Sequence, residues 1–516
     1  MTDDLDNLSP GANQAPARSP LKGMGSFASN FLSMTGGALA AQALSFFFIP
    51  VLSRLFPPEA YGVATIFGTV ASVICIISCL RYQLAIVLPE RDEDAAPIFS
   101  LCVFLSVVVA ALVCAAIWGL GPSTFSWLGG ADLGTHRWWL PLAVLLGGIT
   151  LPLRYWGTRH KHFRMLASRQ VLASLVFVGT ALPAGLLGYR TGTSLILAWI
   201  ISTAVGAVTL ALPLLSSDGR FLLANSSAAA MARMGRRYVR FPLVDSWAAL
   251  LQGLSANISI LMMTAVLGAS VVGLYAKSLQ LLLIPLTLIG TSISQVLYQR
   301  AAEKRAANQD ISGLIQGVVN RLITVSMLPT VVIALIGADV FAIICGRNWG
   351  EAGVYATILS PWLLVVGLTN PLLGLFNITE RLGASFLYNL VVLIVRIAAI
   401  ALGGVVIKNA RWTMAIYMVV GIIAEGWLLW YLLSLVGVSL RSTAHVAGLH
   451  LLHALPTAAA AAGAKWVFGF PPHLTVSVAL VVSASYWYLA FRRDALFKGY
   501  LAKARDKFRS ALGGGR

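Results

Sequence analysis

The chain has 516 residues, of which 58% are hydrophobic and only 11% are charged, and its mean hydropathy is +0.82. Soluble proteins carry about a quarter charged residues, so this composition excludes a set of soluble domains and indicates a polytopic membrane protein. The net charge is +18, and most of the basic residues fall in short segments between apolar runs. The positive-inside rule explains them better than a nucleic-acid partner does.

Apolar runs long enough to cross a bilayer recur from one end of the chain to the other, since a membrane helix needs about 20 mostly apolar residues. The predicted spans lie at residues 31–54, 60–80, 96–119, 138–157, 171–188, 193–215, 241–266, 272–297, 317–343, 352–374, 383–407, 412–436, 444–464 and 473–491. The fold class is therefore an all-α membrane protein with about 14 transmembrane helices. An even number of spans places both termini on the same side.

The distribution of Lys and Arg sets the orientation. With the N-terminus in the cytoplasm, the inner segments hold 25 basic residues and the outer segments hold 7, while the remaining five lie within spans or at their margins. Because inner loops carry the excess of positive charge, we expect both termini to be cytoplasmic. The expected location is the cytoplasmic (inner) membrane.

A weak internal repeat divides the spans. A shift of 211 residues aligns 52–56 with 263–267, and 62–64 with 273–275. Both stretches join an odd-numbered span to the next one, so the repeat is parallel. The predicted parts are a cytoplasmic tail (1–28), a six-helix lobe (29–216), a basic cytoplasmic linker (217–240), a second six-helix lobe (241–436), two additional helices (437–491) and a basic amphipathic cytoplasmic tail (492–516).

Four segments carry a resemblance to a known family: residues 52–67 (LSRLFPPEAYGVATIF), 80–98 (LRYQLAIVLPERDEDAAPI), 154–172 and 275–303. They resemble Wzx-type polysaccharide flippases of the multidrug/oligosaccharidyl-lipid/polysaccharide (MOP) exporter superfamily. The resemblance implies alternating access, with a polyprenyl-diphosphate-linked oligosaccharide flipped for O-antigen or exopolysaccharide assembly. It also implies a monomer that acts with a polysaccharide polymerase and export proteins.

Ionisable residues inside apolar spans are costly, so each is a candidate functional residue. The cations are Arg81, Arg154, Lys277, Arg321 and Arg396. If they line one cavity, they suit a diphosphate, whose oxygens Arg recognises with its forked donors. The alternative is that Arg81, Arg154, Arg321 and Lys277 reach the interface along their own helices. Members of the family that this chain resembles often have Arg where this chain has Gln280. Lys277 lies one turn before Gln280.

Uncharged and acidic groups extend this set. Asp245, Gln252 and Ser259 recur every seven residues in one span, so they share a face that either lines the cavity or packs against another helix. Arg396 and Glu425 lie at similar depths in consecutive antiparallel spans, and we expect them to pair. Such a pair is either a static staple or a coupling site, in which Glu425 takes up a proton; Asp245 is the other candidate for ion coupling.

Other chemistry finds little support. The five cysteines form no CxxC pattern, and His450 and His453 have no Cys or carboxylate nearby in sequence, so neither a metal nor a cofactor is expected. The competing interpretations are a peptidoglycan-precursor flippase or a cation-coupled drug exporter of the same fold, and a polysaccharide polymerase or glycosyltransferase. The enzyme interpretation requires a large polar outer loop, whereas the longest one expected, 121–137, contains only one carboxylate, Asp132. A transporter is therefore the prediction.

Overall fold

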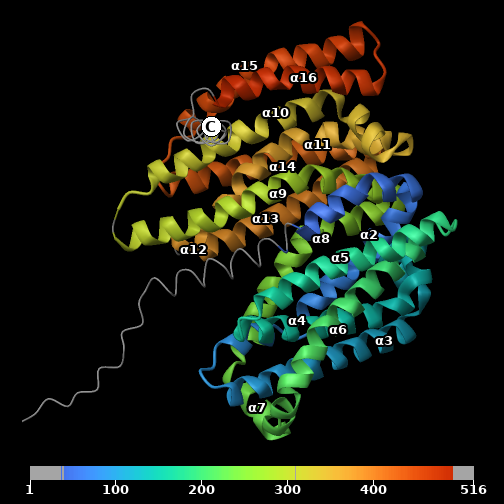
Figure 1. Ribbon diagram of the computed structural model, residues 1–516, viewed down its shortest axis with the longest axis vertical. Helices are drawn as coiled ribbons and strands as arrows, with labels where there is room; N and C mark the ends of the chain where they lie inside the picture. The colour runs from blue at the N-terminus through green and yellow to red at the C-terminus, as the bar shows by residue number, and fades with distance from the viewer. Residues whose placement is uncertain (1–36, 38–39, 308, 380, 492–516) are drawn as a thin grey trace, which may run out of the picture.

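The computed structural model describes residue 37 and residues 40–307, 309–379 and 381–491, and these ranges contain helices and no strand. A helix occupies each predicted span (Figure 1). In chain order they are Ala40–Leu55, α2 (Pro58–Ile77), α3 (Asp92–His136), α4 (Leu140–Arg159), α5 (Phe163–Leu186), α6 (Gly192–Asn225), α8 (Ser246–Leu267), α9 (Ala269–Ala306), α10 (Ser312–Cys345), α11 (Gly350–Thr369), α13 (Leu382–Ala401), α14 (Ala410–Ser434), α15 (Leu440–Ala462) and α16 (Pro472–Phe491). The two terminal tails predicted at 1–28 and 492–516 lie outside the described residues.

The length and hydropathy of these helices are those of a multi-pass membrane protein. Within the described ranges, ten helical segments are long and apolar enough to cross a bilayer. Ala40–Leu55 and the first part of α9, Ala269–Leu283, are shorter apolar helices. We call the end of the bundle at which α2 and α9 begin the predicted outer end, and the opposite end the predicted inner end, because the charge distribution alone assigns them.

Local sequence explains where several helices begin and end. Pro58 opens α2 at a position whose N–H would have no helical partner. The Asn409 side chain caps α14 by accepting hydrogen bonds from the N–H groups of Arg411 and Trp412. Gly268 has φ 85°, a conformation that favours glycine, and it makes the abrupt turn between α8 and α9. Before α10, the Ser312 backbone and hydroxyl donate to Asp310 and hold the pKa of that carboxyl below its usual value.

The helices form two lobes with an additional pair at one edge (Figure 1). The helix Ala40–Leu55 and α2–α6 make the first lobe, α8–α14 make the second, and α15 and α16 pack against α10. The parallel repeat is visible in the element boundaries. α2 and α9 begin 211 residues apart, and short 3-10 turns, η2 (Arg137–Trp139) and η4 (Arg347–Trp349), precede α4 and α11 in corresponding places. The residue limits predicted for the lobes stay predictions.

Two stretches expected to be loops are helical. The segment 121–137, expected as the longest outer loop, continues α3 to His136, so that this helix has 45 residues. The predicted linker 217–240 contains the end of α6 and a short helix, α7 (Ala228–Arg237). Ala230 and Met234 of α7 are buried, whereas Arg233, Arg236 and Arg237 are exposed. The basic linker is thus an amphipathic helix that packs on α3.

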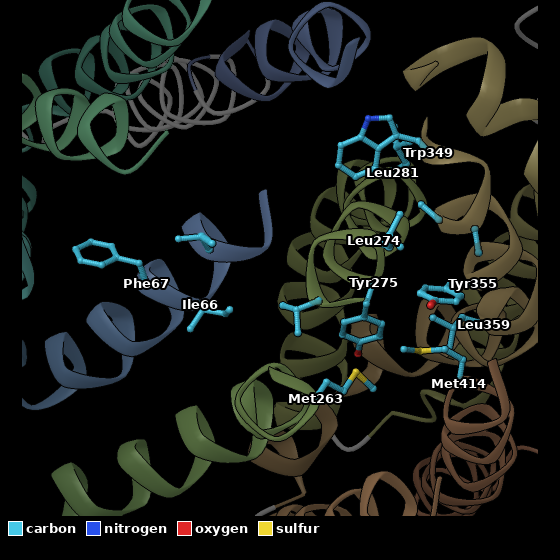
Figure 2. Packing of buried hydrophobic residues seen from close by; sticks show 14 of the residues in the cluster. Ile66, Phe67, Met263, Leu274, Tyr275, Leu281, Trp349, Tyr355, Leu359 and Met414 are labelled. Atoms are coloured by element: carbon cyan, nitrogen blue, oxygen red, sulfur yellow. The ribbon is translucent and has the colours of Figure 1, made fainter. Parts of the chain in front are cut away.

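The largest buried apolar cluster joins both lobes at the predicted outer end. Ile66 and Phe67 lie on α2 of the first lobe, and Tyr275 of α9 lies in the same cluster as Tyr355 of α11 and Met414 of α14 in the second lobe (Figure 2). All five side chains are at least nine-tenths buried. Burial of this much apolar surface across the two lobes stabilises their contact at this end.

Candidate functional site

The two lobes meet most closely where α2 and α9 cross at the predicted outer end. A Cβ atom at Gly62 would lie 1.8 Å from the carbonyl oxygen of Ala269, and one at Gly273 would lie 1.9 Å from that of Pro58. Gly273 is 211 residues after Gly62, and Ala269 is 211 residues after Pro58. The contact is therefore made twice by equivalent residues of the repeat, and only glycine permits the two backbones to approach so closely.

Polar contacts between the lobes surround this crossing. Trp349 of η4 donates its ring N–H to the Ser53 carbonyl at 2.7 Å, and Arg54 donates to the Ile343 carbonyl at 2.7 Å. The Ser270 hydroxyl donates to Glu59 at 2.8 Å. With the glycine crossing, these bonds close the space between the lobes at the predicted outer end.

Lys277 of α9 is enclosed within this closure. Its side chain is 2% exposed, and its ammonium lies 3.6 Å from the centre of the Tyr61 ring and 5.4 Å from that of Trp349. The two rings meet edge to face. The ammonium donates to the side-chain oxygen of Gln280 at 3.2 Å, and it takes part in none of the ion pairs among the described residues. A cation over ring faces is held by the negative face of the π system.

A second polar site lies inside the second lobe. It is a cavity of about 440 Å³ between α8, α13 and α14 and the turn that follows α11. Its polar lining consists of Gln252, Ser255, Asn370, Ser385, Tyr388, Asn389, Arg396 and Glu425. These groups are hydrogen-bond donors and acceptors with one cation and one anion, a lining that suits a small polar ligand or an ion.

The ion pair predicted between Arg396 and Glu425 forms at this cavity. Nη2 of Arg396 lies 3.8 Å from Oε1 of Glu425, and the side chains are 17% and 11% exposed. Thr369 donates to the other carboxylate oxygen at 2.9 Å. Nη1 of Arg396 donates to the Ser255 carbonyl at 3.4 Å, and its guanidinium lies over the Tyr417 ring at 5.8 Å. Both charges are therefore partnered in a nearly buried setting.

The polar face predicted on α8 serves three different purposes. Ser259 is buried and shares a hydrogen bond of 2.9 Å with the Tyr417 hydroxyl, so in this conformation it packs between helices. Gln252 is exposed and lines the polar cavity. Asp245, at the predicted inner end, accepts a hydrogen bond of 2.7 Å from Nε of Arg81 and so joins the lobes there.

The remaining predicted cations stand apart from these sites. Arg154 of α4 and Arg321 of α10 are exposed. Arg169 falls between the predicted spans 138–157 and 171–188, and the structure places it in α5, partly buried beside Gly206 of α6. Its Nε has no hydrogen-bond partner among the described residues, and Arg154 is its charged neighbour. The sequence signal for this position is weak: Arg169 lies two residues before the predicted span that begins at residue 171.

An apolar pocket of about 780 Å³ adjoins the enclosed lysine. Its walls come from the helix Ala40–Leu55 of the first lobe and from α9, α10 and α11 of the second, and they include Phe46, Leu281, Pro329 and Phe341. Leu281 lies one helical turn beyond Lys277. At the equivalent interface of the repeat, α2 and α8 pack directly, since a Cβ at Gly253 would lie 2.1 Å from Cδ1 of Ile76.

In this conformation the candidate residues thus occupy distinct places. Lys277 and Gln280 belong to the closed outer end, Arg81 and Asp245 form an inter-lobe pair at the inner end, and the remaining acid, Glu425, lies in the polar cavity. Among the described residues no three His, Cys, Asp or Glu side chains are grouped as metal ligands. The arrangement offers positive charge, hydroxyl and amide groups and an apolar pocket near one lobe interface.

Comparison with known proteins agrees with this architecture. A family model described as "Polysaccharide biosynthesis protein" matches residues 51–354. The fold is similar to the solved structure of the lipid II flippase MurJ in an inward closed conformation, with a TM-score of 0.68 and 10% identity over 90% of this chain and 98% of that one. It is also similar to an inward-facing multidrug resistance MATE family transporter of the MOP superfamily, with a TM-score of 0.60 and 14% identity over 78% of this chain and 95% of that one. A search of curated protein sequences gives no match.

The family model spans well over half of the 516 residues. The two structural likenesses, at such low identity, establish the fold and nothing about the cargo. Together with the helical membrane architecture, these findings confirm the resemblance read from the sequence motifs: the chain belongs to the polysaccharide biosynthesis protein family, with the fold of the MOP superfamily of flippases and transporters.

Proposed function

We propose that the protein flips a polyprenyl-diphosphate-linked oligosaccharide from the cytoplasmic to the outer leaflet of the bacterial inner membrane, for the assembly of O-antigen or exopolysaccharide. It works by alternating access between its two lobes and catalyses no bond change. The membership of the family of polysaccharide biosynthesis proteins supports a saccharide cargo.

The observation that carries this proposal is the apolar pocket next to a lone cation at the lobe interface. The pocket has about 780 Å³ and an almost wholly apolar lining, and it reaches within one turn of Lys277. A lipid-linked saccharide needs both environments, because its tail is hydrocarbon and its diphosphate is anionic. An ammonium is a suitable point charge for phosphate oxygens.

The cavity in the second lobe supplies the remaining requirements of a transport cycle. Gln252, Asn370 and Asn389 offer amide groups to sugar hydroxyls, and the Arg396–Glu425 pair is the candidate for ion coupling. Asp245 is the second candidate, because protonating it would release Arg81 and free the lobes at the inner end. Arg154, Arg169 and Arg321 would attract the anionic headgroup before it enters.

The decisive experiment measures transbilayer movement in proteoliposomes. Fluorescent undecaprenyl-diphosphate oligosaccharide is incorporated, and a membrane-impermeant quencher reports the fraction that reaches the outer leaflet. We expect protein-dependent movement of this lipid, slower movement of lipid II and none of a neutral glycolipid with the same tail. Movement equal to that in protein-free liposomes, or faster movement of lipid II, contradicts the proposed cargo.

A matched pair of variants tests the pocket in the same assay. Ala43→Trp places an indole into the pocket, whereas Ala40→Trp places one on an exposed position of the same helix outside it. We expect the first variant to slow flipping several-fold and the second to leave the rate unchanged. Equal rates in the two variants would remove the pocket from the mechanism.

A further inference from the structure

The enclosure of Lys277 depends on both lobes. Trp349 and Gln280 belong to the same lobe as the lysine, but the nearest ring, that of Tyr61, belongs to α2 of the other lobe. The ring centre of Tyr61 is 3.6 Å from the ammonium, and no carboxylate pairs with it among the described residues. A buried ammonium without an anion is costly, so the Tyr61 ring supplies much of what stabilises it.

Separation of the lobes at the outer end therefore changes the surroundings of Lys277. Tyr61 is one residue before Gly62, whose contact with Ala269 sets the α2–α9 crossing, so this ring moves with the crossing. When α2 leaves α9, the ammonium loses its principal aromatic partner while Trp349 and Gln280 stay beside it. It then faces the space opened between the lobes, where water or an anion replaces the ring.

We propose that Lys277 is a conformation-dependent ligand for the diphosphate of the cargo, enclosed by Tyr61 when the outer end is closed and exposed to the phosphate oxygens when it opens. The inference rests on the proposed function and adds a coupling to it. The aromatic ring and the diphosphate compete for one ammonium, so binding of the headgroup at Lys277 favours opening of the outer end. A ligand shifts a conformational equilibrium only through its different affinity for the two states, and this exchange of partners supplies that difference.

The neighbouring side chains make the exchange specific to an anion. Glu59, the carboxylate closest along α2, and Arg54 both belong to the first lobe, so an opening that breaks their bonds to Ser270 and Ile343 carries both away from Lys277. The apolar pocket begins one turn along α9, at Leu281. A headgroup at Lys277 can therefore keep a hydrocarbon tail in that pocket.

The reactivity of a native cysteine reports whether the outer end is closed or open. Cys345 ends α10 and is fully buried in the apolar cluster that contains Trp349 and against which Tyr61 packs. We would replace Cys75, Cys79, Cys102 and Cys114 with Ala, place the protein in nanodiscs and measure the rate at which a water-soluble maleimide modifies Cys345. The probe is undecaprenyl diphosphate, and undecaprenol is the neutral control with the same tail.

The expected result is that undecaprenyl diphosphate accelerates modification several-fold and undecaprenol does not. Tyr61→Leu should raise the basal rate and keep the acceleration, because the cation is still present. Tyr61→Phe, which keeps a ring, should behave as the parent protein does. Lys277→Met should lose the acceleration, and Lys277→Arg should retain it.

Two outcomes overturn the inference. If Lys277→Met, still monodisperse and folded, responds to undecaprenyl diphosphate as the parent does, the lysine is not the phosphate ligand. If Tyr61→Leu leaves the basal rate unchanged, the ring does not hold the closure. Both are separate from the flipping assay, since a chain that flips the cargo while failing either test retains the proposed function and loses only this coupling.

Discussion

Arg396 lies near the middle of the apolar segment Gly383–Val406, too far from either end for its side chain to reach water along the helix, and the protein accommodates it with partners. Glu425 supplies the opposite charge, the Ser255 carbonyl accepts a hydrogen bond, and Tyr417 presents a ring face. Removing one member of a nearly buried pair leaves an uncompensated charge, which costs about 3–5 kcal/mol. The depth of these two residues was enough to predict the pair from sequence.

This pair gives the first prediction. Glu425→Gln keeps the shape of the side chain and a group that can accept from Thr369, but it removes the charge that balances Arg396. If the pair is a staple, the midpoint of thermal unfolding should fall by several degrees and membrane abundance should drop. Thr369→Val is the control, since it removes one hydrogen bond and keeps both charges. Unchanged stability with loss of dependence on an ion gradient would instead identify Glu425 as the coupling group.

Lys277 shows where prediction from sequence stops. Its position about two turns into α9 was readable from the sequence, but its partner Tyr61 lies more than two hundred residues away in the other lobe. A helical period reveals which residues share a face, whereas a ring from another lobe is positioned by the packing of whole helices. The same reason hid the hydrogen bond between Ser259 and Tyr417.

At the scale of single elements, the crossing of α2 and α9 is the most sensitive to side-chain size. The second prediction concerns Gly62→Ala and Gly273→Ala, whose new methyl groups would meet backbone oxygens at under 2 Å. Forcing extra atoms into a packed contact costs about 1–3 kcal/mol. We expect both variants to lower the unfolding midpoint and to raise the modification rate of Cys345.

Gly68→Ala provides the control for that prediction. Gly68 also belongs to α2, but a Cβ added there meets no atom within 4 Å. This variant should keep the parent's unfolding midpoint or raise it slightly, because Ala favours helix over Gly. Equal destabilisation by Gly62→Ala and Gly68→Ala would show that helix propensity, and not the crossing, sets the effect.

Arg159 at the end of α4 organises residues 86–92, which belong to one of the segments that resemble the flippase family. It pairs with Asp92 at 2.7 Å and donates to the carbonyls of Ile86, Pro89 and Glu90. One guanidinium thereby fixes η1 (Tyr82–Val87) and the start of α3. Its five donors in a planar fork make these bonds together, which an ammonium is too compact to reproduce.

The third prediction follows from this geometry. Arg159→Lys should loosen the 80–91 segment almost as much as Arg159→Ala, visible as faster limited proteolysis there. Arg164→Ala, at an exposed position in the first turn of α5, is the control with the same loss of charge. Full protection in Arg159→Lys would mean that charge alone holds the segment.

Element boundaries were predicted unevenly, for physical reasons. Hydropathy located each predicted membrane helix. A run of about twenty apolar residues is unfavourable in water, and inside a bilayer it forms a helix that satisfies its own backbone hydrogen bonds. It ended the third span near 119, whereas α3 continues to His136 through residues such as Gly, Ser and Trp that carry weak helical signals. The helix α7 was likewise missed because it is only ten residues long and contains three Arg, although its spacing of Ala230 and Met234 is that of an amphipathic helix.

At the scale of the whole molecule, the fourth prediction is the topology that follows from the distribution of Lys and Arg. Tyr189, in the turn between α5 and α6, should lie outside the cell, and Ala232, on exposed α7, should lie inside. In a cysteine-free background, an impermeant maleimide applied to intact spheroplasts should label Tyr189→Cys and spare Ala232→Cys until the membrane is opened. The reverse labelling pattern would mean that the end named outer here faces the cytoplasm, so that the structure would be closed towards the cytoplasm at the α2–α9 crossing.

The repeat was detectable in the sequence because its strongest match, around Gly62 and Gly273, coincides with the closest contact between the lobes. A pair of positions that must both be glycine resists drift in each half. Elsewhere the two halves match weakly at this shift, because many different apolar residues satisfy a membrane helix. The two lobes follow from that alignment, whereas the docking of α15 and α16 on α10, through His450 bonded to Thr324 and Tyr486, does not.

The pocket beside the helix Ala40–Leu55 differs from the equivalent place of the repeat, where α2 and α8 pack directly on each other at Gly253. The protein therefore has a front and a back in the plane of the membrane, even though its two halves are alike. A lipid that diffuses laterally has one productive direction of approach. On the proposed function, an enzyme that hands its lipid-linked saccharide directly to this protein would have to stand on that side, so the orientation of neighbours in the membrane would become part of the pathway's efficiency.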